Sequence, residues 1–451
     1  MKYPNTMAAS AIASALVLFV FTTSTLAAPG FKLLRFNEEW AATDAAKSAP
    51  VASLKAMELG NGRHLTLGGE FRARGEHWRN FAFDEPADSD DSFLLHRYSA
   101  FGDLSFGNGF RIFAEALYAD ATDRDLPGGK RPADVDGLDF KNLFFDYSMA
   151  PPVGESATLR VGRQQLAFGK QRLVSPLPWA NSFRKWDGIS LIVEGGPWKA
   201  HGFATQFVEN EKYDLNSSSS EDRFHGLYLT RGSNLDLYYL YRDNEATAEE
   251  LNTVGIRFSG LISGWDYDFE TAYQFGDRGS EDISAWMLGT KAGYRVADVA
   301  WSPRPFIGFD FGSGDDDPND GDANRFNQLF PLGHAYLGFS DLIGRQNILA
   351  VNSGMDLKPS ARLTVTNMVH GFWRADKSDA LYNAGGGVLR SPTDDAGRFV
   401  GIEYDLTASY NIGSGWRSLV GYSALFGGDF IKDTGSDKTV QVLYGQIQYR
   451  F

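Results

Sequence analysis

The chain has 451 residues, and 43 Lys and Arg against 57 Asp and Glu give it a formal net charge of −14. This charge argues against a nucleic-acid-binding protein, which needs a concentrated basic surface to meet phosphates. The chain contains no Cys, so disulfides, thiolate catalysis and Cys-ligated zinc are excluded. It contains 49 Gly, and 14% of its residues are aromatic, so its fold must accommodate many turns and many rings.

The N-terminus has the pattern of an export signal. Lys2 is followed by an almost unbroken apolar stretch over 7–21 and then by small residues. We predict cleavage after Ala27, so that residues 1–27 form a signal peptide. A retained membrane anchor is the alternative, but about 15 apolar residues are fewer than the roughly 20 that a spanning helix needs. Residues 28–64 show no strand pattern and are predicted to form a periplasmic N-terminal extension.

From residue 65 to residue 451, apolar and polar residues alternate over segments of about ten residues, which is typical of β-strands. In one such segment Tyr267 and Phe269 alternate with Asp266 and Asp268. Alternation alone is typical of both a soluble sandwich and a membrane barrel. We count 18 such segments, at 65–79, 93–106, 110–120, 138–149, 157–168, 187–195, 198–208, 223–231, 235–243, 251–260, 265–275, 283–296, 304–312, 347–357, 361–374, 398–410, 416–426 and 440–451.

The connections between these segments decide between the two folds. Several are tight turns, at 107–109, 196–197, 232–234, 262–264, 359–360 and 412–415. Between them fall long polar stretches, at 80–92, 121–137, 169–186, 209–222, 313–346, 375–397 and 427–439. Short periplasmic turns that alternate with long external loops are typical of bacterial outer-membrane barrels. We therefore predict an all-β, transmembrane, antiparallel up-and-down β-barrel of about 18 strands in the outer membrane of a Gram-negative bacterium.

The size and the C-terminus of the predicted barrel narrow its class. A TonB-type receptor is excluded, because it needs about 22 strands and a plug domain. The last segment ends with Tyr449 and Phe451 on its apolar face. A terminal strand that ends in an aromatic residue is the form recognised by the outer-membrane assembly machinery, and an ordinary closing strand is the alternative. The expected surroundings are outer-membrane lipid and lipopolysaccharide.

Several short segments resemble the alginate export family of outer-membrane proteins. They follow one another in order over nearly the whole mature chain, at 35–40, 67–72, 160–165, 186–188, 313–320, 326–331 and 372–374. The resemblance implies an 18-stranded barrel, in agreement with the count of segments, and a polyuronate such as alginate as one possible solute. Membership of this family does not fix the solute.

The polar face of each strand would line the pore of such a barrel, and it carries charges of both signs. These charges could pair across the wall and brace a water-filled lumen. Alternatively, arginines could form an anion-selective constriction, because a ring of guanidinium charge lowers the barrier for carboxylates. The candidates on the strands are Arg72, Arg74, Arg97, Arg111, Arg160, Arg362 and Arg374.

The predicted loop 169–186 carries Lys170, Arg172, Arg184 and Lys185 and no acidic residue. It also contains several large apolar residues, and so apolar a loop seldom stays in water. We expect it to fold inward and narrow the pore, with Arg172, Arg184 and Lys185 close together at the constriction. A solvated external loop is the alternative.

The sequence gives only weak signs of other chemistry. Asp315, Asp317, Asn319 and Asp320 resemble a calcium-binding loop, but Pro318 breaks the usual spacing, so a solvated acidic loop is the alternative. The seven His show no paired metal spacing, and no Ser lies in a nucleophile elbow. We predict no cofactor and no enzymatic activity.

These observations predict an outer-membrane channel through which anionic solutes or a polysaccharide diffuse passively, either in export of an alginate-like polyuronate or in uptake of a preferred solute. The alternatives are an outer-membrane barrel hydrolase and a structural barrel whose lumen is largely blocked. The sequence predicts neither the direction of transport nor an oligomeric state.

Overall fold

The computed structural model describes residues 30–40, 49–85, 89–317, 319–393 and 395–451. The predicted signal peptide, residues 1–27, lies outside these ranges. Within them, no helix is long and apolar enough to cross a membrane.

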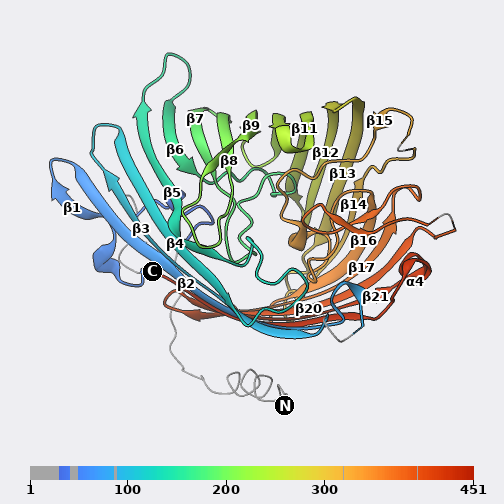
Figure 1. Cartoon of the computed structure of the whole chain (residues 1–451). Coiled ribbons are helices and arrows are strands. Elements are labelled where there is room, and N and C mark those ends of the chain that lie inside the picture. The colour runs from blue at the N-terminus through green and yellow to red at the C-terminus, as the bar shows by residue number, and fades with distance from the viewer. Residues whose placement is uncertain (1–29, 41–48, 86–88, 318, 394) are drawn as a thin grey trace.

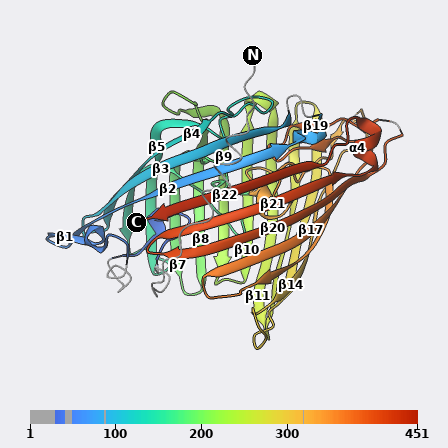
Figure 2. The ribbon, with the colours of Figure 1, turned by 90° about the horizontal axis from the view of Figure 1, so that it is seen from below.

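Eighteen antiparallel strands form one closed barrel, which confirms the predicted fold (Figures 1 and 2). Each strand pairs with the next along the chain, and β22 pairs with β2 from Glu70↔Arg450 to Arg79↔Gln441. Among the described strands, the closure leaves no long edge unpaired. The strands are β2 (Arg63–Arg79), β3 (Asp91–Ser105), β4 (Phe110–Thr122), β5 (Asp136–Met149), β6 (Ser156–Gln164), β7 (Trp186–Gly195), β8 (Trp198–Val208), β9 (Ser218–Arg231), β10 (Leu235–Asn244), β11 (Glu249–Ile262), β12 (Trp265–Arg278), β13 (Glu281–Tyr294), β14 (Arg304–Gly312), β16 (Ile348–Leu357), β17 (Leu363–Arg374), β20 (Phe399–Gly413), β21 (Trp416–Gly427) and β22 (Val440–Arg450).

Short elements accompany the barrel. The predicted N-terminal extension contains β1 (Met57–Gly60), which pairs with the start of β2. β15 (Asp322–Ala323) pairs in parallel with β13. Between β17 and β20, β18 (Leu381–Tyr382) and β19 (Val388–Arg390) form a small hairpin, and α4 (Asp429–Thr434) lies between β21 and β22. The longest connections lie at one end of the barrel and most tight turns lie at the other, as predicted. Two short connections, 245–248 and 279–280, also lie at the long-loop end, and the nine-residue connection 295–303 lies at the opposite end.

The two faces of each strand differ as the alternation predicted. Tyr267 and Phe269 of β12 are each 38% exposed and face outward, where a bilayer would contact them. Asp268, between them, forms ion pairs inside the barrel with Arg172 and Arg257. The outer surface therefore meets lipid with rings and aliphatic side chains, while charged groups line the interior.

The buried core lies inside the barrel, and loops supply part of it. One cluster joins Leu173 and Val174 of the loop between β6 and β7 to Phe203 and Phe224 of the wall. A second cluster joins Leu337, Leu342 and Ile343 to wall residues of β3 and β22. Buried apolar contacts of this kind hold the loops inside the barrel, and Figure 1 shows loop segments within the ring of strands.

Candidate functional site

The loop at 169–186, called the basic loop from here on, lies inside the barrel, as its composition suggested. Arg172 is 1% exposed and forms ion pairs with Asp268 and Glu270 of β12. Its Nε also lies 3.8 Å from Oδ1 of Asp310 on β14. Gly289 of β13 leaves room for this guanidinium, because a Cβ there would lie 2.5 Å from the Arg172 Nε. The first half of the basic loop is thus fixed to β12 and β14.

The second half of the basic loop is held on the other side of the barrel, through its backbone. Arg72 of β2 donates from Nη1 to the carbonyl oxygens of Pro178 and Trp179, at 3.1 Å each, and from Nη2 to that of Ala180 at 2.8 Å. Arg97 of β3 donates to the carbonyls of Pro178 and Ala180 at 3.1 and 2.9 Å. Counted around the ring of 18 strands, β12 lies ten strands from β2 in one direction and eight in the other, so the two strands are almost opposite each other. The basic loop therefore crosses the lumen nearly along a diameter.

Lys185 and Arg172 bind different parts of the wall. Lys185 Nζ lies 2.6 Å from Asp136 Oδ2 at the start of β5, and both side chains are fully buried. Arg172 binds the carboxylates of β12 and β14. The expectation that these cations and Arg184 gather in one zone is therefore corrected, because separate carboxylates on the wall hold Arg172 and Lys185.

Arg184 has a different environment. Its Nη1 donates to the carbonyl oxygen of Pro331 at 2.8 Å, and no carboxylate among the described residues lies within 4.0 Å of its guanidinium. Burial lowers the pKa of Arg184 to about 10, so the side chain stays cationic at neutral pH. It is half-buried and lines a cavity.

The remaining strand arginines of the predicted set are engaged in ion pairs or bind backbone oxygens. Arg111 Nε lies 2.7 Å from Asp103, and Arg160 donates to both oxygens of Asp146 at 2.8 Å. Arg74 Nε lies 2.7 Å from Glu76 Oε1. These contacts neutralise much of the basic charge that the sequence assigned to a constriction.

Two arginines lie where the sequence prediction did not expect them. Arg374 donates to the carbonyl oxygens of Lys377, Asp379, Ala396 and Gly397, so it secures an external connection. Arg362 lies in the short turn before β17, at the end of the barrel opposite the long loops. Its assignment to the constriction is corrected, because β17 begins only at Leu363.

A second loop folds inward, which the sequence interpretation missed. The stretch 313–346 was predicted to be external, but residues 325–347, called the second inward loop, are largely buried. Phe326 is fully buried, and Val174 of the basic loop forms a parallel bridge with Phe330. Ser175 N donates to the Phe330 carbonyl at 2.8 Å. The signal was present, because 329–339 is as rich in large apolar residues as the basic loop.

The tip of the second inward loop is hydrogen-bonded to β20. Ser340 donates from its backbone N and from Oγ to the two oxygens of Glu403, at 2.8 and 2.7 Å. Phe339 N donates to Asp405 Oδ2 at 3.4 Å. Gly338 has a φ of +91°, and a Cβ there would lie 2.5 Å from the Glu403 carboxyl group. The close approach of this tip therefore requires glycine.

A stack of planar groups joins the two loops to the wall. The Arg74 guanidinium lies 4.0 Å from the centre of the Trp179 indole. The other neighbours in the stack are His334, 3.7 Å from Trp179 between ring centres, and Phe339, 4.8 Å from His334. Both inward loops are thus bound to each other and to β2.

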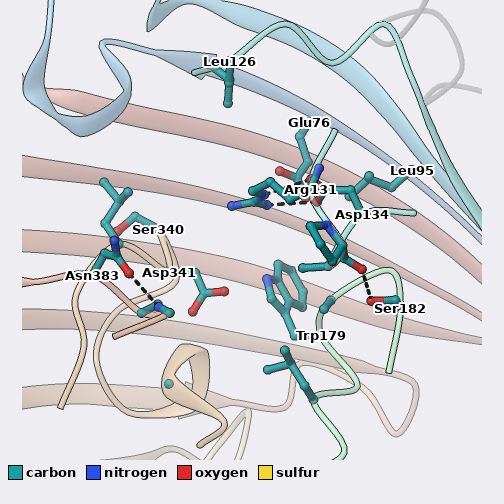
Figure 3. A pocket seen from close by; sticks show the side chains of 18 of the residues that line it. Glu76, Leu95, Leu126, Arg131, Asp134, Trp179, Ser182, Ser340, Asp341 and Asn383 are labelled. Carbon is teal, nitrogen blue, oxygen red and sulfur yellow. Dashed lines mark hydrogen bonds and ion pairs between the residues drawn. The ribbon is translucent and has the colours of Figure 1, made fainter. Parts of the chain in front are cut away.

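A cavity of about 610 Å³ lies between the two inward loops and the long-loop ends of β2, β3 and β22 (Figure 3). Its walls are partly apolar, from residues such as Trp78, Phe93, Leu95, Leu126 and Leu342. Its charged lining residues are Arg74, Glu76, Arg124, Arg131, Asp134, Arg184 and Asp341.

Most charges of this cavity are paired. Arg124 and Arg131 share the carboxylate of Asp134, at 3.3 and 2.9 Å. Asp341 differs, because its carboxylate forms no hydrogen bond or ion pair with any described residue. Burial raises the pKa of Asp341 to about 6.

The short-turn end of the barrel holds the seam between the first and last strands. Phe451 N and O pair with Gly69 of β2 at 3.1 and 3.0 Å. Arg35, in the segment 31–40 called the N-terminal clasp, donates to the carbonyl oxygens of Gly69 and Phe451 at 3.1 and 3.0 Å. The neighbouring Phe36 packs on inward-facing rings of β4 and β5. Tyr449 stacks on Trp416 of β21.

Comparison with known proteins agrees with this geometry. The model of the family described as alginate export matches residues 63–444. The chain belongs to the alginate export family. No individually curated protein matches it.

The solved structures that are similar to this alginate export family protein are outer-membrane barrels. The outer membrane protein OprD from Pseudomonas aeruginosa has 12% identity and a TM-score of 0.56, with 86% of this chain and 93% of that chain covered. OccAB1 from Acinetobacter baumannii has 12% identity and a TM-score of 0.56, with 85% and 97% covered. OccK5 (OpdH) from Pseudomonas aeruginosa has 10% identity and a TM-score of 0.55, with 85% and 98% covered. At these identities the likeness shows the fold.

The family and the barrel together support an outer-membrane channel in a lipid environment. The predicted acidic loop of this family member gives no positive sign of a metal site. Asp317 and Asp320 accept hydrogen bonds from backbone N–H groups of their own loop, at 3.1 and 2.9 Å. Among the residues that the structure describes, no three carboxylate or His side chains converge as metal ligands there.

Proposed function

We propose that this protein is a passive outer-membrane channel for small anionic solutes, which diffuse down their gradient past two inward loops. The observation that carries the proposal is Arg184, a cation on a loop that crosses the lumen, for which the described part of the chain supplies no carboxylate partner. A fixed charge in a narrow, partly dehydrated zone acts on a passing ion more strongly than a surface charge.

Of the three cations that were expected at the constriction, Arg184 is the one on which the proposed selectivity depends. Arg172 and Lys185 belong to buried ion pairs, so each is largely compensated by neighbouring carboxylates. Replacing either of them would disturb the loop as well as the charge. Among the described residues, the Arg184 guanidinium donates one hydrogen bond, to the carbonyl oxygen of Pro331, and lies 6.0 Å from the centre of the Phe330 ring. Its replacement therefore tests selectivity with less change in loop structure than replacement of Arg172 or Lys185.

The test is single-channel recording of the purified protein in a planar bilayer, with a tenfold KCl gradient. We expect an anion-selective reversal potential in the unmodified protein and a shift toward cations in Arg184→Ala. Lys170→Ala is the matched control, because Lys170 lies on the same loop but is exposed. A cation-selective channel that Arg184→Ala leaves unchanged would refute the proposal.

A channel that never opens in this recording would favour the blocked structural barrel. A hydrolase would be recognised by release of fatty acid or peptide from outer-membrane substrates, with purified protein in detergent. We expect no such release.

Export of a polyuronate is the second candidate, and membership of the alginate export family favours it. A polymer would require the inward loops to move, which would break the contacts of Arg72 and Glu403 with their backbones. Oligouronates of increasing length on either side of the bilayer test this candidate. Current blocks whose duration increases with the length of the oligouronate would support polymer passage. Blocks of equal duration by a monomer and by a hexamer would refute it.

We also propose that the chain reaches the outer membrane after cleavage at Ala27, with Tyr449 and Phe451 as the assembly signal. The hydrophobic stretch at 7–21 and the terminal aromatic strand support this route. N-terminal sequencing of the protein from isolated outer membranes should begin at Ala28. Deletion of Phe451 should lower the amount of heat-modifiable barrel in those membranes.

A further inference from the structure

The cavity between the inward loops contains a feature that passive diffusion does not require. Asp341 and Arg184 carry opposite charges, line the same cavity and do not contact each other within 4.0 Å. We infer that this cavity binds a small carboxylic acid that has an apolar side group and a hydrogen-bond donor beside its carboxylate. An α-amino acid and an α-hydroxy acid both have this chemistry. The inference rests on the proposed channel function, because the solute is taken to enter from the side of the long loops.

The cationic side of the cavity can receive the carboxylate. The guanidinium of Arg184 has five N–H donors, and the hydrogen bond that it forms with the described residues is the one from Nη1 to the carbonyl oxygen of Pro331. Arg131 and Arg124 share one carboxylate, that of Asp134. In total the cavity is lined by four arginines and three carboxylates, so it has an excess of one positive charge. A guanidinium with free donors and a carboxylate form strong, directional hydrogen bonds.

Asp341 can accept a hydrogen bond from the donor group that the ligand carries beside its own carboxylate. Figure 3 shows its carboxylate turned into the cavity, on the side of Trp179, without a dashed contact. A partly buried carboxylate with no hydrogen bond is costly, so a site that leaves one open gains from a ligand that supplies a donor. An ammonium group or a hydroxyl group would meet this need. The raised pKa of Asp341 agrees with a missing partner.

The apolar walls define the rest of the ligand. Phe93, Leu95, Leu126 and Leu342 offer a surface that would leave the hydroxyl groups of a sugar ring without partners. An aromatic or branched side group would instead bury apolar area there. The volume of about 610 Å³ is in the usual range for small-molecule sites. These walls therefore favour an apolar amino or hydroxy acid over a uronate.

Four probes separate the parts of the inference. L-Phenylalanine has an ammonium group beside its carboxylate, 3-phenyllactate has a hydroxyl group there, and 3-phenylpropionate has neither. Glucuronate has the carboxylate and hydroxyl groups but no apolar side group. Isothermal titration of the full-length protein in detergent measures binding of each probe without any need for conduction.

We expect phenylalanine or phenyllactate to bind at least roughly tenfold more tightly than phenylpropionate and glucuronate, because a hydrogen bond to a charged group contributes about this much. Arg184→Ala should weaken the binding of either probe by a similar factor. Asp341→Asn keeps an acceptor oxygen but removes the charge. This substitution should therefore weaken the binding of phenylalanine strongly and that of phenyllactate only slightly. The difference shows whether Asp341 binds an ammonium group or a hydroxyl group.

The controls are Lys377→Ala and Asp316→Asn, which remove exposed charges from loops outside the cavity lining. All variants should keep the heat-modifiable migration of a folded barrel. Asn is compatible with the positive φ of 52° at position 341. Equal binding of phenylpropionate and the two donor probes would overturn the inference, as would tighter binding of glucuronate or an unchanged affinity in both cavity variants.

The same protein in a planar bilayer distinguishes failure of the site from failure of the channel. A barrel that conducts anions but binds none of the donor probes would overturn only the site. A barrel that binds them and never conducts would support the site and refute the channel.

Discussion

The backbones of the two inward loops are held at the barrel wall by side chains of opposite type. The basic loop offers backbone carbonyl oxygens to the guanidinium groups of Arg72 and Arg97. The second inward loop offers backbone N–H groups and a hydroxyl group to the carboxylates of Glu403 and Asp405. Every residue except Pro has both a backbone donor and a backbone acceptor, so basic and acidic side chains on the wall can each fix a loop.

A charged residue on the inner face of a strand can act on a solute, or it can hold a loop in place. Arg72 is 2% exposed and its donors are used by the basic loop, so its main role is to position that loop. Arg184 is half-buried and lines the cavity. Burial and partners, rather than residue type, distinguish the two roles.

The largest effect should come from Arg172→Ala, which removes the side-chain anchor of the basic loop. It would leave Asp268, Glu270 and Asp310 buried with fewer cations. We expect a loss of about 3–5 kcal/mol in the free energy of unfolding, as for other broken buried ion pairs. Conductance should also rise, because the first half of the loop would be released. Thermal unfolding followed by circular dichroism measures the stability.

Lys170→Ala is the control for this prediction, since it removes an exposed charge two residues away. If Arg172→Ala unfolds at the same temperature as this control, the ion pairs of Arg172 with β12 and β14 contribute little to the stability of the protein.

A smaller effect is expected from Arg72→Lys, which keeps the charge but not the shape of the side chain. A lysine ammonium cannot reproduce the fork of donors that reaches Pro178, Trp179 and Ala180. The expected loss is about 2–3 kcal/mol, with a changed emission of Trp179 in a variant in which other tryptophans are replaced. Full retention of both properties would show that charge alone holds the loop.

Gly338→Ala should affect only the second inward loop. The new Cβ would overlap the carboxyl group of Glu403, and the φ of +91° disfavours any other residue. We expect about 1–3 kcal/mol of destabilisation from this crowding. Proteolysis of intact cells should then reach residues 325–347, which it should spare in the unmodified protein. Gly321→Ala is a useful comparison, because that glycine also has a positive φ but open space around it.

The smallest expected effect is a change of ion selectivity with pH. Asp341 has a pKa of about 6, so it is ionised above pH 6 and loses its negative charge as the pH falls below that value. Its charged neighbours are Arg74, Glu76, Arg131 and Arg184. Burial lowers the pKa of His334, on the same loop, so His334 should stay neutral.

The excess positive charge of the cavity should therefore grow by about one elementary charge between pH 7.5 and pH 5. Reversal potentials across this range should become more anion-selective. Asp341→Asn should remove most of the change. A pH profile that is identical in this variant would assign the titration to another group.

The barrel could be predicted from the sequence because its physical signals are local. Alternation with a period of two and the order of short and long connections determine the strand count and the closure. The inward fold of the basic loop was also predictable, since its apolar residues stand together. The second inward loop was missed because the stretch 313–346 was interpreted as one unit, and its acidic first part, around Asp315 and Asp317, masks the apolar part that follows.

The hydrogen bonds that hold the two inward loops at the wall could not be predicted, for a different reason. Arg72 binds the backbone oxygen of Pro178, 106 residues away in the sequence, and Glu403 binds the backbone N–H of Ser340, 63 residues away. A backbone atom has no sequence signature, so these contacts can be found only from the folded arrangement. The same holds for Asp341, because the absence of a hydrogen-bond partner for its carboxylate among the described residues is a property of the folded cavity.

The N-terminal clasp has a consequence for the order in which the protein is built. Arg35 binds the carbonyl oxygens of Gly69 and Phe451, which come together only when β22 has joined β2. Arg35 can therefore bind both oxygens at once only after the ring is complete, although this segment is synthesised before every strand. The contact between Arg35 and Phe451 thus depends on closure of the ring, since a segment that precedes every strand in the sequence reaches the C-terminal carbonyl oxygen across the finished seam.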